Sequence, residues 1–124
     1  MFLRLGRAYA QLVRFEQYLR RNQFNRLYER VRSCPIRNTR PHRATQDEIC
    51  RAVNLACVLY FKEVLCLQRA ATTTCLLRQD VIPAQMVIGV QPLPFSAHAW
   101  VEVEGIVVND KLYTPGLYSV LSRC

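Results

Sequence analysis

Long apolar runs are missing from this sequence of 124 residues, although 51% of its residues are hydrophobic. A membrane-spanning helix needs roughly 20 consecutive apolar residues, and no stretch approaches that length. A secretory signal peptide needs an uninterrupted apolar segment after its basic start, whereas Arg4, Arg7 and Arg14 break up the beginning of this chain. We therefore expect a protein that is made and kept in the cytoplasm.

Acidic side chains are scarce in residues 1–43, which contain eleven arginines but only two acidic residues, Glu16 and Glu29. Residues 44–124 carry six basic and seven acidic side chains, so the net charge of +8 belongs to the first third of the chain. A basic helical region can bind nucleic acid, a membrane surface or an acidic partner, or it can simply be solvated. Because no nucleic-acid-binding motif accompanies it, we expect no nucleic acid partner; membrane association is compatible with the pattern but not required.

Six cysteines, at positions 34, 50, 57, 66, 75 and 124, would suffice for a disulfide framework. The reducing cytoplasm expected above keeps thiols free, so we interpret most of them as small apolar side chains. A zinc site made of Cys34, His42 and Cys50 would have an unusual spacing and no fourth ligand. The sequence therefore predicts neither a metal nor another cofactor.

Apolar residues recur every three or four positions in the first two thirds of the chain. This spacing predicts helices over residues 2–21, 23–32, 45–61 and 66–78. Thr45, followed three residues later by Glu48, is a capping box that starts the third helix. Residues 33–44 contain two prolines and no periodicity, so we place a boundary there. It separates a basic helical region, residues 1–43, from a core, residues 44–124, within one compact unit.

Beyond Pro83 the pattern changes to that of strands, over residues 85–90, 97–103 and 106–109, with a hairpin turn at Glu104-Gly105. Helices followed by neighbouring strands predict an α+β fold with an antiparallel sheet. The hairpin register matters for function. A three-residue loop, Val103 to Gly105, would place His98 opposite Asp110, whereas a two-residue loop would place His98 opposite Lys111.

Cys66 is the one cysteine that we predict at a helix N-terminus, where unpaired N–H groups and the helix dipole favour a thiolate. With His98 as a base and Asp110 as an orienting carboxylate, it would make the series of groups that a cysteine nucleophile needs. The register with the three-residue loop is what this triad requires. Taken singly, an inert buried cysteine and an ordinary core histidine remain the alternatives. The backbone N–H of Cys66 can serve as an oxyanion donor, but a second donor is not evident from the sequence.

Three segments of the sequence together carry a resemblance to a known family: CLQRA at 66–70, PAQMVIGV at 83–90 and FSAHAWVEVEG at 95–105. In order and spacing they resemble the transglutaminase-like, papain-like cysteine protease family that removes leader peptides in lasso-peptide biosynthesis. The likeness covers about residues 62–110. The short chain resembles the stand-alone protease type, in which leader recognition lies mainly on a separate small protein.

This resemblance implies a small papain/transglutaminase-like core, with the catalytic cysteine at a helix N-terminus packed on an antiparallel sheet. It implies cleavage of the peptide bond between the leader and the core of a ribosomal precursor, with Cys66, His98 and Asp110 as the catalytic residues. The implied partners are the precursor's leader peptide, a leader-recognition protein and, as a further candidate, the lasso cyclase. A transglutaminase-like acyl transferase and a non-enzymatic basic binding module remain alternatives.

If leader recognition lies mainly on a separate protein, the basic helices of this chain have a role to fill in binding that protein. We expect Arg14, Arg20, Arg21 and Arg26 to help dock the leader-bound partner or an acidic leader. The alternative for these side chains is a solvated helix face.

Overall fold

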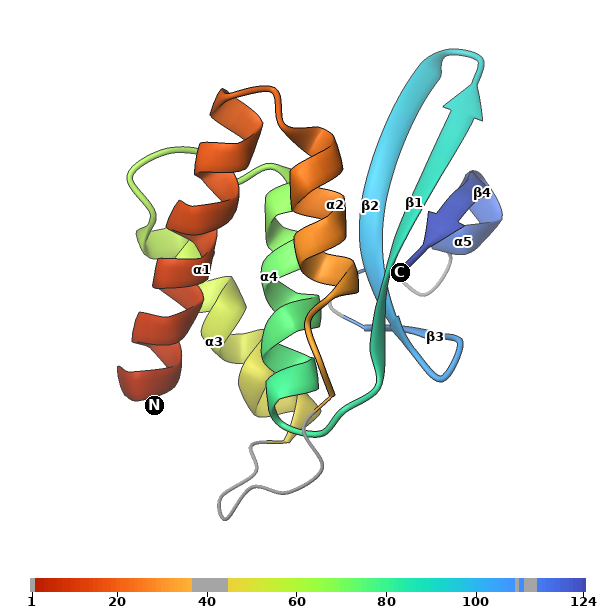
Figure 1. Cartoon of the computed structure of the whole chain (residues 1–124). Coiled ribbons are helices and arrows are strands. Elements are labelled where there is room, and N and C mark those ends of the chain that lie inside the picture. The colour runs from red at the N-terminus through yellow and green to blue at the C-terminus, as the bar shows by residue number, and fades with distance from the viewer. Residues whose placement is uncertain (1, 37–44, 109, 111–113) are drawn as a thin grey trace.

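The computed structural model describes residues 2–36, 45–108, 110 and 114–124. Helices come first and strands follow, so the α+β fold predicted from the sequence is confirmed (Figure 1). The strands form one antiparallel sheet in the order β3-β2-β1-β4. The elements are α1 (Phe2–Arg20), α2 (Phe24–Arg32), α3 (Gln46–Leu59), α4 (Cys66–Gln79), β1 (Ala84–Pro92), β2 (Phe95–Val103), β3 (Ile106–Val108), α5 (Thr114–Leu117) and β4 (Ser119–Arg123).

Helix α4 lies at the centre, between the other long helices and the sheet (Figure 1). Every side chain from Ala70 to Arg78 is buried. The run of alanine and threonine at 70–74 has short side chains, which lets helices approach on one side and strands on the other. Three consecutive threonines have mediocre helix propensity, so tertiary packing stabilises this helix.

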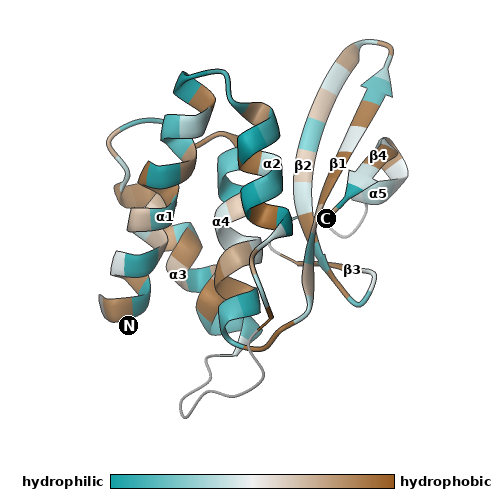
Figure 2. Cartoon of the chain, viewed as in Figure 1, coloured by the Kyte–Doolittle hydropathy of each residue, from teal (hydrophilic) through white to brown (hydrophobic). Residues whose placement is uncertain are grey.

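One hydrophobic core joins the helices to the inner face of the sheet. It includes Leu12 and Phe15 of α1, Val53 of α3, Leu77 of α4 and Val101 of β2. The basic region and the remainder of the chain thus contribute side chains to the same core. Helix α2 buries only Leu27 and Val31 and is hydrophilic over most of its surface (Figure 2). The division at residues 43 and 44 stays a prediction, since that boundary lies outside the described residues.

The capping box at the start of α3 is confirmed. The Glu48 N–H donates to Thr45 Oγ1 at 3.2 Å, and the Thr45 N–H donates to Glu48 Oε1 at 3.4 Å. Two short elements, α5 and β4, were not predicted from the sequence. Strand β4 extends the sheet beside β1, and the next residue, Cys124, exchanges two backbone hydrogen bonds of 3.0 Å with Met86.

The β2–β3 hairpin corrects the predicted register. Val103 pairs with Ile106, so the loop has two residues, Glu104-Gly105, and the predicted three-residue loop is wrong. Both loop residues have positive φ, 52° and 79°, as a type I′ turn requires. Strand β3 ends at Val108, so pairing with β2 does not determine the position of Asp110.

The helices show no span suited to a bilayer: within the described residues, none is both long and apolar enough to cross a membrane.

Candidate active site

Cys66 is the first residue of α4, and its side chain is exposed. Leu65 is the N-cap and has the extended backbone of such a residue, φ −75° and ψ 153°, but it makes no side-chain capping hydrogen bond. The first backbone hydrogen bond of the helix runs from the Arg69 N–H to the Leu65 carbonyl. The preceding N–H groups, including that of Cys66, therefore point out of the helix without an intrahelical acceptor.

His98 and Asp110 form a hydrogen-bonded pair, with His98 Nε2 at 2.7 Å from Asp110 Oδ2. The other carboxylate oxygen, Oδ1, accepts a hydrogen bond of 3.3 Å from the hydroxyl of Thr114 in α5. Thr114 is buried and had no signal in the sequence that pointed to the site. With Nε2 held by a carboxylate, the neutral imidazole keeps its lone pair on Nδ1, which is the nitrogen left for proton exchange.

Cys66, His98 and Asp110 line the same cavity, which has a volume of about 270 Å³. It lies between the N-terminal end of α4 and strand β2, and Val108 at the end of β3 also lines it. Arg69, one helical turn after Cys66, also lines it. Sequence reasoning missed Arg69, although residues three apart share a helix face.

The imidazole of His98 packs with two aromatic rings in a cluster of three, in which the centroids of Trp100 and Tyr118 also lie 5.9 Å apart. The imidazole centroid lies 6.0 Å from that of Trp100 and 5.5 Å from that of Tyr118. Gly89 of β1 pairs directly with His98, and a Cβ at this glycine would lie 2.7 Å from Trp100 and 2.8 Å from Tyr118. A residue without a side chain is what allows both rings to come close to the sheet beside the histidine.

A family comparison matches residues 10–123 to the transglutaminase-like superfamily. The chain belongs to this superfamily. Membership indicates a cysteine-type enzyme, either a protease or an acyltransferase. Searches of curated proteins and of solved structures found no match for the chain.

Of the six cysteines of this transglutaminase-like chain, all described and all free, Cys66 alone is exposed. The others differ in how easily they ionise. Burial raises the pKa of Cys57 and of Cys124, and burial together with Asp47 raises that of Cys50 to about 11.

Among the thiols that are not exposed, Cys34 is the exception because its pKa is lowered rather than raised. A hydrogen bond with the Cys75 thiol and the charges of Arg30 and Arg78 lower the pKa of Cys34 to about 7, despite its partial burial. The same hydrogen bond raises the pKa of Cys75. Any measurement of thiol reactivity in this transglutaminase-like domain must therefore separate Cys34 from Cys66.

The segment that leads into Cys66 is tied to α1 through Glu16, whose side chain is only 8% exposed. Its carboxylate accepts a hydrogen bond of 3.0 Å from the Tyr60 hydroxyl and lies 3.2 Å from Lys62 Nζ. Burial and this carboxylate raise the pKa of Tyr60 to about 12. The first helix thus helps to position the residues just before the proposed nucleophile.

The four arginines singled out in the sequence do not form one group. Arg14, Arg21 and Arg26 line a hollow between α1 and α2. Arg20 lies on the opposite flank of α1, where its Nη1 is 4.0 Å from Glu16 Oε2. A docking role for any of them stays a prediction.

No group of three or more His, Cys, Asp or Glu side chains in the described part of this transglutaminase-like domain is arranged to hold a metal ion. His42, considered above as a zinc ligand, lies outside that part of the chain.

Proposed function

We propose that this chain is a cysteine peptidase of the stand-alone leader-peptidase type, which cleaves the leader from a ribosomally made lasso-peptide precursor. Cys66 is the nucleophile, His98 the general base and Asp110 the carboxylate that orients the base. The leader peptide is part of the substrate, and a separate leader-recognition protein is the partner. Family membership supports the cysteine-type chemistry, and the three sequence segments described above support the substrate class.

One observation carries the catalytic part of this proposal: an exposed thiol and a hydrogen-bonded His-Asp pair line a single cavity. The thiol comes from the start of α4, the imidazole from β2 and the carboxylate from the segment after β3. Side chains so far apart in the sequence converge where a peptide from solvent can reach the sulfur. The His98–Asp110 pair holds the imidazole in one tautomer.

The proposed reaction follows from this arrangement. His98 Nδ1 takes the proton of the Cys66 thiol, and the thiolate attacks the carbonyl carbon of the scissile bond. The imidazolium then gives its proton to the departing amine, which leaves a thioester on Cys66. Water, deprotonated by the same imidazole, hydrolyses the thioester and restores the thiol. Asp110 stabilises the imidazolium in both halves of the reaction.

The open N-terminus of α4 has a role in the same steps. As the carbonyl carbon becomes tetrahedral, its oxygen gains negative charge and needs hydrogen-bond donors already in place. The Cys66 N–H is such a donor, and no side chain of Leu65 competes for the neighbouring N–H groups. The positive end of the helix dipole adds to the stabilisation of this oxygen.

The test uses the purified chain, its Cys66→Ala, His98→Ala and Asp110→Asn variants, and the precursor peptide and leader-recognition protein that the proposed function implies. Mass spectrometry then follows release of the leader. We expect no release by Cys66→Ala, and a loss of about a hundred-fold or more for His98→Ala. Circular dichroism serves as the control for folding. Leader release by Cys66→Ala at the rate of the unchanged protein would exclude the nucleophile assignment.

The acyl transferase alternative is separated in the same experiment, because a thioester can be resolved by water or by an amine. Hydrolysis adds the mass of water to the new carboxyl end, whereas transfer to an added primary amine leaves the mass of that amine. An excess of glycine amide in the reaction therefore shows whether water or an amine resolves the thioester. A product that carries the amine in preference to water would replace the peptidase by a transferase.

A further inference from the structure

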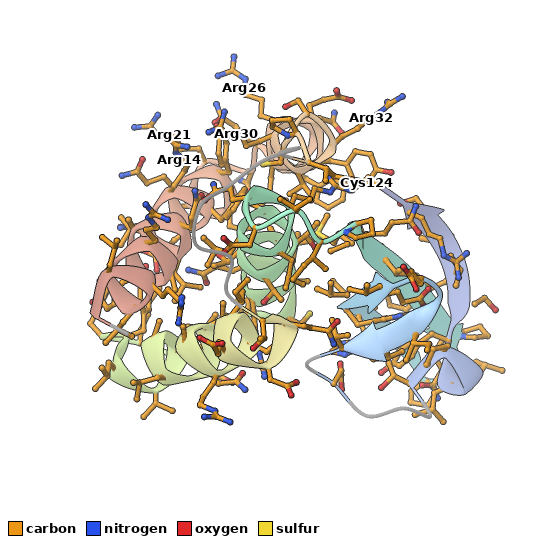
Figure 3. The ribbon with its side chains drawn as sticks, turned by 90° about the horizontal axis from the view of Figure 1, so that it is seen from below. Arg14, Arg21, Arg26, Arg30, Arg32 and Cys124 are labelled. Carbon is orange, nitrogen blue, oxygen red and sulfur yellow. The ribbon has the colours of Figure 1, made fainter. Side chains whose placement is uncertain are left out.

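Among the described residues, a cleft between α1 and α2 is lined by three arginines and no acidic side chain. It has a volume of about 260 Å³, and we name it the arginine cleft by its lining residues: Arg14, Gln17, Tyr18, Arg21, Gln23 and Arg26. All three arginines are exposed, and they extend from the ribbon on the side where α1 and α2 meet (Figure 3). The amides and the phenol hydroxyl add neutral hydrogen-bond donors to the guanidinium groups.

Within the described part of the protein, no carboxylate neutralises the charges of this cleft, although the charge of Arg14 helps to lower the pKa of Cys34. Arg4, Arg20 and Arg32, on the same two helices, lie 2.6, 4.0 and 3.6 Å from the carboxylates of Glu48, Glu16 and Glu29. For Arg14, Arg21 and Arg26 no described carboxylate lies within ion-pair distance. Three like charges around one hollow repel one another, so their grouping does not stabilise the fold. An anionic ligand would remove that repulsion.

The position of the cleft indicates which anion. In Figure 1 the C-terminal end of α1, the start of α2 and the N-terminal end of α4 all lie at the same end of the molecule. A second hollow lies on the other flank of α1 and is lined by Glu16, Leu19, Arg20, Lys62, Glu63, Leu65 and Gln68. Glu63 also lines the cavity of Cys66, so the two hollows adjoin. A peptide held at Cys66 can continue past Lys62 and Arg20, over the end of α1, into the arginine cleft.

We propose that the arginine cleft binds an acidic stretch of the peptide substrate, at a distance from the bond that is cut. The carboxylates of that stretch pair with Arg21 and Arg26, and Arg14 adds to the positive potential. The inference rests on the proposed function, because it takes the chain to act on peptides. Guanidinium groups suit carboxylates because they present paired donors in one plane.

The test links the cleft to the thiol with a two-part probe. A chloroacetyl group that alkylates thiols is joined through glycine-serine spacers of increasing length to a short run of glutamates, and a matched probe carries glutamines. The rate of Cys66 modification is measured by mass mapping, in a Cys34→Ser background. We expect the glutamate probe to react roughly ten-fold faster than the glutamine probe at low salt, because the exposed ion pairs are weak one by one but add together. This advantage should be lost at high salt, which screens the ion pairs.

Two double variants locate the effect. Arg21→Gln/Arg26→Gln should bring the ratio of the two probe rates close to one. Arg7→Gln/Arg51→Gln removes the same charge from exposed positions away from the cleft and should keep the ratio. A ratio that is unchanged in the first pair, or lost equally in both, overturns the proposal and points to non-specific attraction by the net charge.

Binding without chemistry separates this proposal from the proposed function. A fluorescein-labelled glutamate peptide is titrated with the Cys66→Ala variant, and anisotropy reports its affinity. Binding that weakens in Arg21→Gln/Arg26→Gln supports the cleft, even if no probe ever modifies Cys66, in which case the catalytic assignment alone fails. If duplex DNA binds more tightly than the glutamate peptide and depends on the same two arginines, the ligand is nucleic acid and the proposal is wrong.

Discussion

The two ends of α4 are built in opposite ways. At the N-terminal end, Leu65 makes no capping hydrogen bond and Cys66 is exposed. At the C-terminal end, the Arg78 guanidinium is buried and donates to four carbonyls. Its acceptors are the oxygens of Ala84 at 2.9 Å, Val31 at 2.6 Å, Cys34 at 3.4 Å and Cys124 at 2.7 Å.

This difference separates stability from reactivity along one helix. The Arg78 end joins α2, β1 and the C-terminal residue, and it is ordered enough to hold Val81 at φ 69°, a strained conformation for a β-branched residue. Among the described residues, the N–H donors and the thiol at the Cys66 end have no such partners. Under the proposed function, the polar groups at that end serve a substrate, while the other end supplies the contacts that hold the helix.

The largest effect should come from removing Arg78. Arg78→Met leaves four carbonyls without their donor, and each buried unsatisfied group is costly, so we expect a loss of about 3 kcal/mol or more in the free energy of unfolding. Urea denaturation measures it. Arg30→Met, at an exposed position on α2, should change that free energy by no more than about 0.5 kcal/mol. Equal effects of the two substitutions would mean that the Arg78 hydrogen bonds contribute little.

A smaller effect, at the reactive end, is expected from Gly89→Ala. The new Cβ would lie 2.7 Å from the Trp100 ring and 2.8 Å from Tyr118 Cβ. Because a Cβ moves only with its backbone, the site is overpacked at a cost of about 1–3 kcal/mol. The shifted rings pack against His98, so leader release should slow more than the loss of stability explains at temperatures where the variant is folded.

The control for this substitution is Gly116→Ala, since a Cβ at Gly116 meets nothing within 4 Å. Activity and urea midpoint are compared for both variants. A Gly89→Ala protein that is destabilised but keeps full activity would show that the aromatic packing does not position the imidazole.

Local patterns predicted most of the fold. The four long helices and three strands follow from residue spacing, and the Thr45 capping box from a motif of four residues. Strand β4 could not be found in this way, because four of its five residues are exposed and no alternation appears. Its place beside β1 depends on the return of the chain after α5, which is a long-range property.

The candidate site was predicted in part, and one step of that reasoning failed. Cys66, His98 and Asp110 could be named from order and residue type, but the three-residue loop thought to be required for their meeting does not occur. Glu104 adopts φ 52°, which residues other than glycine, asparagine and aspartate seldom do, so residue type alone does not favour the two-residue loop over the three-residue one. Thr114 reaches Asp110 only in the folded chain.

The smallest expected effect, and the sharpest test of the difference between the two ends, is to cap the open end. Leu65 already has the backbone of an N-cap, so Leu65→Asp should stabilise the protein by about 1 kcal/mol through hydrogen bonds from the N–H groups of the first turn. The same carboxylate accepts hydrogen bonds from the N–H groups that would otherwise face a substrate, and it places a negative charge beside the thiol. Alkylation of Cys66 by iodoacetamide should therefore slow several-fold.

Two further variants are the controls for this prediction. Leu65→Ser supplies the cap without the charge and should give a similar gain in stability with a smaller loss of rate. Leu121→Asp, at another exposed leucine, controls for the added charge. If Leu65→Asp changes neither the urea midpoint nor the rate, the N-terminus of α4 is not the open donor site described above, and the two ends of the helix differ less than their hydrogen bonds indicate.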